Sequence, residues 1–102
     1  EKVDKAIKFL KKAIIHNKHF IQAYTTLGTA YLMRGLVEEG IKANLEAVAI
    51  QPDFPIAHNN LAVAYLEQKD YENAIKHCDE AVRLGFEVNK AMLDELAPFR
   101  SA

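Results

Sequence analysis

Apolar residues recur along this chain at the three- and four-residue spacing of one helical face, in segments separated by short turns. The first such segment, residues 2–16, has its apolar face at Ala6, Ile7, Leu10, Ala13 and Ile14. The same spacing predicts further helices near residues 20–34, 37–50, 54–68, 71–84 and 88–99. The pattern therefore indicates an all-α protein of about six helices.

Glycine, proline and aspartate residues predict where several of these helices begin and end. Gly35 and Gly85 stand where a helix usually stops in a left-handed cap. Asp53 and Asp70 are placed to accept hydrogen bonds at helix N-termini. Pro98 should end or kink the last helix, because proline has no backbone N–H to donate.

Residues 21–54 and 55–88 are two versions of one segment, offset by 34 residues. They agree at 11 of 34 positions, where ordinary residue usage gives roughly two by chance. The matches are Ala23/Ala57, Leu27/Leu61, Ala30/Ala64, Tyr31/Tyr65, Leu32/Leu66, Glu38/Glu72, Ile41/Ile75, Lys42/Lys76, Glu46/Glu80, Ala47/Ala81 and Val48/Val82. A fixed period of this length predicts an array of repeats that bury their apolar sides against one another.

At these positions the chain resembles the tetratricopeptide repeat (TPR) family, whose pattern is W-x2-L-G-x2-Y, then A-x3-F, then P. The first copy supplies Tyr24, Leu27, Gly28, Tyr31, Gly40, Asn44 and Pro52; the second supplies His58, Leu61, Ala62, Tyr65, Ala74, Cys78 and Phe86. The departures are Tyr or His for Trp, Gly for Ala, Asn or Cys for Phe, and Phe for the final Pro. The resemblance implies an α-α superhelix, a solenoid of antiparallel helix pairs.

On this interpretation the chain has four parts. Residues 1–20 are the second helix of a preceding partial repeat with its turn, 21–54 and 55–88 are two TPR repeats, and 89–102 form a C-terminal capping helix. Because the chain begins with Glu1 and not Met, we expect a fragment or small domain of a TPR protein, whose start hides any targeting signal.

Small residues are predicted where the two helices of each pair approach most closely. They are Gly28, Gly40 and Ala47, repeated as Ala62, Ala74 and Ala81. Larger side chains should fill the space around this contact: Leu27, Tyr31, Ile41 and Val48, with Leu61, Tyr65, Ile75 and Val82.

Composition and charge narrow the possible functions. The 102 residues carry a net charge of −1, so no overall field recruits nucleic acid or anionic lipid, and no apolar run approaches the roughly 20 residues of a membrane helix. The charge is uneven: residues 1–20 hold six lysines against two acids, and the rest hold seven basic against twelve acidic residues. A basic leading end and an acidic trailing end could meet head-to-tail between copies.

The sequence lacks motifs for catalysis, cofactors or metals, so we predict a protein that is not an enzyme. There is no glycine-rich phosphate loop and no H-E-x-x-H. At helical spacing Cys78 has only Ala74, Ile75, Ala81 and Val82, none of which is a metal ligand, so it is predicted to be a small core residue. His16 and His19 straddle a helix end, which does not favour a zinc site. This lone cysteine excludes an internal disulfide and favours a reducing compartment, with the cytoplasm expected.

In the TPR family the first helix of each pair lines a concave groove that holds an extended or helical peptide. The resemblance places the following residues in that groove: Gln22, Thr25, Thr29, Leu32, Met33, Ile56, Asn59, Asn60, Val63, Leu66 and Glu67. Leu32, Val63 and Leu66 could equally be core, because the family packs neighbouring helices through similar positions.

The composition of this groove predicts a neutral to partly apolar protein or peptide partner. Asn60 stands at one position of the carboxylate clamp found in chaperone-binding members of the family, but Thr25 and Thr29 replace the clamp's first-repeat Lys and Asn. The leading function is therefore a non-catalytic scaffold for protein–protein interaction. The alternative is a structural, self-assembling module that oligomerises through the uncovered face of the first helix, at Ile7, Leu10 and Ile14.

Overall fold

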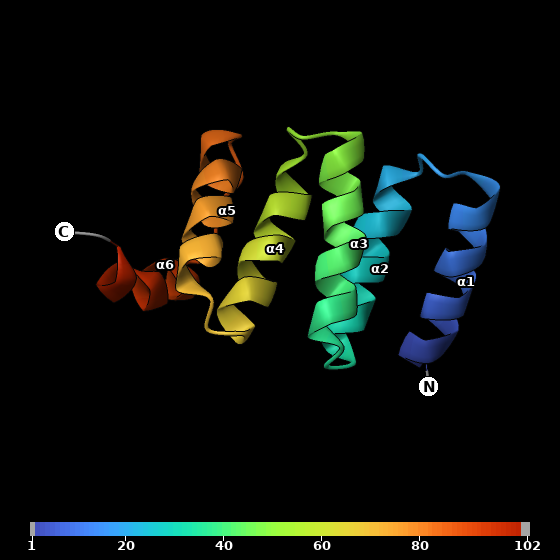
Figure 1. Ribbon diagram of the computed structural model, residues 1–102, viewed down its shortest axis with the longest axis horizontal. Helices are drawn as coiled ribbons and strands as arrows, with labels where there is room; N and C mark the ends of the chain where they lie inside the picture. The colour runs from blue at the N-terminus through green and yellow to red at the C-terminus, as the bar shows by residue number, and fades with distance from the viewer. Residues whose placement is uncertain (1, 101–102) are drawn as a thin grey trace.

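The computed structural model describes residues 2–100, and within that range it is entirely helical apart from short connections. Successive helices stand side by side and alternate in direction along an array of 46 × 27 × 19 Å (Figure 1). The elements are α1 (Lys2–His16), α2 (Ile21–Met33), α3 (Val37–Ile50), α4 (Pro55–Glu67), α5 (Tyr71–Arg83), α6 (Lys90–Leu96) and the short 3₁₀ helix η1 (Ala97–Phe99). The predicted all-α solenoid of antiparallel pairs is confirmed.

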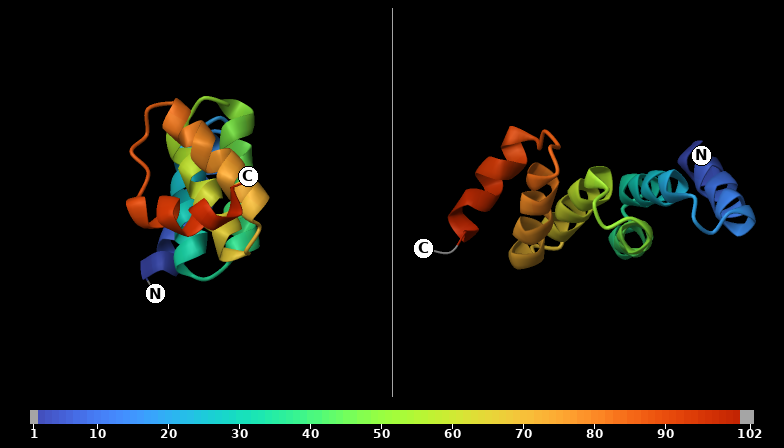
Figure 2. Two further views of the ribbon diagram at one scale, coloured as in Figure 1. Left: turned by 90° about the vertical axis from the view of Figure 1, so that its left-hand side faces the viewer. Right: turned by 90° about the horizontal axis from the view of Figure 1, so that it is seen from above.

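Each helix from α1 to α5 packs on the next one along the chain, and α2 also contacts α4. Seen from above, α3 lies to one side of both α2 and α4 (Figure 2). Helix α6 lies across the C-terminal end, at a steep angle to α5 (Figure 1). The first helices of the two repeats therefore share one face of the molecule, where the sequence places the groove.

Three left-handed residues turn the chain back at the ends of α2, α4 and α5. Gly35 and Gly85 have φ of +77° and +90°, as their predicted cap positions require. Lys69 takes the same place at the end of α4 with φ of +60°, although its side chain disfavours that conformation. In the first of these turns the Leu36 N–H donates to the Tyr31 carbonyl at 2.8 Å, which satisfies a carbonyl in the last turn of the helix.

The N-caps are partly as predicted. Asp70 caps α5 by accepting from the Asn73 N–H at 3.3 Å. The prediction for Asp53 is wrong: α4 begins at Pro55 with Phe54 in the N-cap place, so Asp53 lies one residue too early to reach the helical N–H groups. Helix α6 is shorter than predicted and begins after Asn89, whose side chain accepts from the Ala91 N–H at 2.7 Å.

The helices of the first repeat cross at glycine, as predicted. A Cβ on Gly28 would lie 2.1 Å from the Nδ2 atom of Asn44, and a Cβ on Gly40 would lie 3.0 Å from the Leu32 side chain. The second repeat fills the same crossing differently, with Ala62 and Cys78, both fully buried. Each repeat therefore balances the size of one residue against that of its partner across the helix pair.

The larger side chains surround these crossings with one exception. Leu27, Ile41 and Leu61 are buried, and Tyr31, Val48, Tyr65 and Ile75 are half-buried. Val82 is 50% exposed, which contradicts its predicted place in the core. Its counterpart Val48 packs against α4 of the following repeat, whereas α6 packs its Met92 and Leu96 on other residues of the last helix pair.

Candidate partner-binding face

The face shared by α2 and α4 contains a hollow of about 460 Å³ between the two repeats. Four residues predicted for the groove line it: Gln22, Thr25, Thr29 and Ile56. Thr26 and Phe54 complete the lining, so the walls carry hydroxyl, amide and apolar groups and no charge. This hollow can offer hydrogen bonds to a neutral main chain together with apolar surface.

A second hollow of about 550 Å³ lies further along, between α4 and the C-terminal segment. From α4 it is lined by Asn59, Val63 and Leu66, all predicted for the groove. Six residues that the sequence analysis did not assign to the groove complete the lining: Phe86, Glu87, Asn89, Ala91, Met92 and Glu95. The amphipathic pattern near 88–99 was visible in the sequence, but the direction in which this helix would lie was not.

The remaining predicted residues have other surroundings. Leu32 packs over Gly40 and joins the core around Ile41 and Leu61, so its core interpretation is the one that the structure supports. Thr25 is also buried, and its hydroxyl donates to the Gln22 carbonyl at 3.1 Å. Met33 is 70% exposed and Glu67 is exposed, and neither lines the two hollows.

Asn60 joins the two repeats through its amide. Its Nδ2 group lies 3.2 Å from the Oδ1 atom of Asn44, 3.2 Å from the Oγ1 atom of Thr29 and 3.4 Å from the Thr25 carbonyl. The orientation of both amides is set by the Gly40 carbonyl, which can only accept and takes the Nδ2–H of Asn44 at 2.9 Å. The donor of Asn60 is therefore engaged inside the protein, and only its Oδ1 atom remains for a partner.

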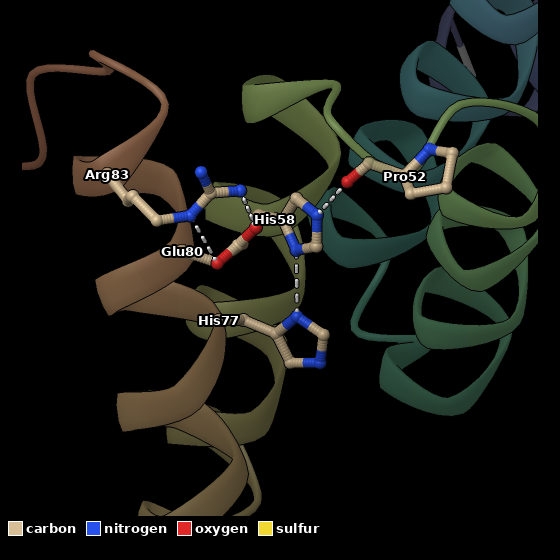
Figure 3. A network of polar contacts seen from close by, with 5 residues as sticks. All are labelled: Pro52, His58, His77, Glu80 and Arg83. Atoms are coloured by element: carbon tan, nitrogen blue, oxygen red, sulfur yellow. Dashed lines mark hydrogen bonds and ion pairs between the residues drawn. The ribbon is translucent and has the colours of Figure 1, made fainter.

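His58 from α4 and His77 from α5 meet in the contact between these two helices (Figure 3). The Nδ1 atoms of His58 and His77 are 3.0 Å apart, and Nε2 of His58 lies 2.6 Å from the Pro52 carbonyl. Because that carbonyl can only accept, Nε2 of His58 carries the proton and donates it there. In the neutral pair His77 then donates its Nδ1–H to His58. Both rings are 8% exposed, and the Tyr65 ring stacks on His77.

This environment opposes charge on the second histidine. Burial, followed by the nearby His58 and Lys76, lowers the pKa of His77 to about 4. Glu80 acts in the opposite direction but more weakly, and its carboxylate also pairs with Arg83 (Figure 3). His77 is therefore neutral near pH 7, and the Nδ1–Nδ1 contact with His58 is a directional hydrogen bond between the two helices.

The cysteine and histidine positions considered for metal have other surroundings. Cys78 is fully buried in the last core cluster, and burial raises the pKa of its thiol. Among residues 2–100, no group of three or more His, Cys, Asp or Glu side chains could hold a metal ion. Within the same residues, no helix has the length and apolar character needed to cross a bilayer.

Together the stacked helix pairs and the hollows along the α2–α4 side define a helical repeat protein. Residues 55–84 match the family model described as tetratricopeptide repeat. A curated relative, the tetratricopeptide repeat domain-containing protein PYG7, chloroplastic, of Arabidopsis thaliana, is 32% identical over 81 residues. That alignment covers 76% of this chain and 27% of the relative, so the chain spans about a quarter of that protein's length.

Solved structures show the same architecture. The crystal structure of MamA superposes with a TM-score of 0.79 at 27% identity, over 82% of this chain and 49% of that one. The Sgt2 TPR domain from Aspergillus fumigatus superposes with a TM-score of 0.84 over 95% of this chain and 65% of that one; at 20% identity this likeness concerns the fold alone. The chain therefore contains a tetratricopeptide repeat and has the fold of tetratricopeptide repeat proteins, which is typical of protein-interaction scaffolds.

Proposed function

We propose that this protein is a non-catalytic scaffold that holds a segment of a partner protein against the face formed by α2 and α4. The observation that carries this proposal is that seven of the residues predicted for the groove line two consecutive hollows on that face. The proposed contact residues are Gln22, Thr25, Thr29, Leu32, Met33, Ile56, Asn59, Asn60, Val63, Leu66 and Glu67. Leu32, Thr25 and Asn60 contribute mainly by shaping the face, because their side chains are engaged within the protein.

The first hollow suits a neutral, partly apolar stretch of the partner. Gln22 is exposed at its rim, where its side chain can bond to a partner's backbone. Thr29 is exposed beside it, but its hydroxyl already donates to the Thr25 carbonyl and accepts from Asn60, so it mainly shapes the rim. Ile56 is 45% exposed and offers apolar surface beside them. Binding here should depend weakly on salt, because no charged side chain lines the hollow.

The test uses a library of random peptides displayed on phage and selected against the protein. Ile56→Glu and Val63→Lys each place a charge in one hollow, and either should weaken the selected peptides about tenfold. Ala49→Glu, on the exposed side of α3, is the matched control and should leave binding unchanged. Unchanged binding in both groove variants would place the site elsewhere on the protein.

A specific observation also favours the self-assembly alternative. Phe9 and Ile15 on α1 are 71% and 74% exposed. Ile7, Leu10 and Ile14, which the sequence analysis placed on the uncovered face, are instead half-buried, so the exposed apolar side chains of α1 are different ones. If α1 mediates oligomerisation, sedimentation velocity should show an apparent mass that rises with concentration. Phe9→Ser with Ile15→Ser should then restore the monomer, and a wild-type chain that stays monomeric at high concentration removes this alternative.

We infer a reducing compartment for the protein, with the cytoplasm as the first candidate, because its single thiol is buried and unpaired at Cys78. The name of the Arabidopsis relative assigns that protein to the chloroplast. Microscopy of the protein with a C-terminal fluorescent tag distinguishes the two locations.

A further inference from the structure

The second hollow differs from the first in its charge. Its floor is apolar, with Met92 buried and Leu66 and Phe86 half-buried, and Val63 adds exposed apolar surface. Glu87, from the turn after α5, and Glu95, from α6, lie at the same hollow and are both exposed. No basic residue lines it.

The ion pairs of the C-terminal segment do not include the carboxylates of Glu87 and Glu95. Between residues 79 and 100 there are three basic and five acidic side chains. Each basic side chain is paired with another acid: Arg83 with Glu80, Lys90 with Asp94 at 2.9 Å, and Arg100 with Asp79 at 2.8 Å. Within the described part of the chain, Glu87 and Glu95 have no ion-pair partner, and they are the two acids that face the hollow.

From this arrangement we propose that the second hollow binds a segment of a separate partner protein in which an apolar side chain is flanked by lysine or arginine. This inference rests on the proposed function, because the hollow is part of the same face. The apolar side chain covers Leu66 and Met92, and the cationic head groups reach Glu87 and Glu95. The aliphatic stems of lysine and arginine add contact with the apolar floor.

The negative charge of Glu87 and Glu95 also disfavours partner segments that are not cationic. An acidic segment would place like charges beside Glu87 and Glu95 next to an apolar surface, where repulsion is screened less than in open solvent. A neutral segment would cover the floor but leave both carboxylates without a counter-charge. The two hollows therefore select different side chains along one bound segment: neutral ones at the first hollow and cationic ones at the second.

Three matched peptides test the proposal alongside the displayed library. Each has the same central Leu-Phe pair, flanked by Lys in the first, Gln in the second and Glu in the third. Fluorescence anisotropy should rank their affinities Lys, then Gln, then Glu, and the library should be enriched in sequences with a cation beside an apolar residue. Glu87→Gln and Glu95→Gln should each weaken the Lys peptide by about two- to fivefold, the usual size of one exposed charge pair.

Controls separate this charge effect from net charge and from loss of the whole face. Glu38→Gln and Glu72→Gln remove the same charge from α3 and α5 and should leave the ranking unchanged. Enrichment of neutral or acidic peptides, or equal binding of all three peptides, would overturn the inference while leaving the proposed function intact. A library with no binder of any class would overturn both. Self-association that Glu87→Gln abolishes would overturn the assignment to a separate partner, with α1 of a second copy as the cationic segment.

Discussion

The Nδ1 atoms of His58 and His77 face each other at 3.0 Å and link the two helices of the second repeat by a buried hydrogen bond. The corresponding positions of the first repeat, 34 residues earlier, hold Tyr24 and Ala43, which cannot form such a bond. The pair is therefore a feature of one repeat and not of the fold. It makes the α4–α5 contact dependent on protonation.

The first prediction concerns stability and pH. The pKa of His77 falls from 6.5 to about 4 on folding, so between these values the unfolded chain binds more protons than the folded one. The contribution of the neutral His77 to the free energy of unfolding is therefore fully present above pH 6.5 and is lost as the pH falls toward 4. We expect a loss of about 2 kcal/mol between pH 7 and 4.5, measured by urea denaturation.

The double variant His58→Tyr/His77→Ala is the matched control, because it installs the residues of the first repeat. It should flatten most of the slope between pH 6.5 and 4.5, above the range where most carboxylates titrate. An equal slope in the wild type and this variant would assign the pH dependence to other groups.

The second prediction concerns the crossing of α2 and α3. Gly28→Ala places a methyl group 2.1 Å from the Asn44 amide and should cost about 1–3 kcal/mol through overpacking. Adding Asn44→Cys copies the pair used by the second repeat and makes room for the methyl group. In a double-mutant cycle by thermal denaturation, the double variant should be less destabilised than the sum of the single variants. Strict additivity would show that the two positions do not share the space.

The third prediction concerns the left-handed residue that ends α4. Lys69 has a φ of +60°, so Lys69→Gly should relieve backbone strain and stabilise the protein by up to about 1 kcal/mol. The same change at Lys76, inside α5, should destabilise the protein by about 1 kcal/mol, because glycine is a poor helix former. The two variants have the same composition, so opposite shifts in melting temperature isolate the backbone effect. A lower melting temperature for Lys69→Gly contradicts it.

The fourth prediction concerns the amide bridge between repeats. Asn60→Ala removes the donor that meets the Oδ1 atom of the fully buried Asn44, and the unpaired oxygen should cost about 1–3 kcal/mol. Its neighbour Asn59 lines the second hollow, and Asn59→Ala should have little effect on denaturation. Equal stability of the two variants would mean that water replaces the lost donor. The same comparison is a control for binding experiments, because a loss of binding in Asn60→Ala can result from a weakened junction between the repeats.

The sequence by itself determined the helices, their order and the residues at their crossings. This was possible because the 34-residue period and the helical spacing are local patterns that each repeat must satisfy to bury its apolar side. The left-handed caps at Gly35 and Gly85 follow from the same local rules, whereas Asp53 failed as a cap because a helix start can shift by one residue.

Only the tertiary structure decided how residues from different helices meet. The path of the chain after Gly85 brings Glu87 and Glu95 to the hollow beside Val63, and no repeat pattern encodes that path. The bond between His58 and His77 and the amide bridge from Asn60 to Asn44 likewise join helices of the array through side chains that the period does not share. Such contacts depend on the relative placement of whole helices, because sequence spacing specifies which face a residue occupies but not which side chain lies opposite.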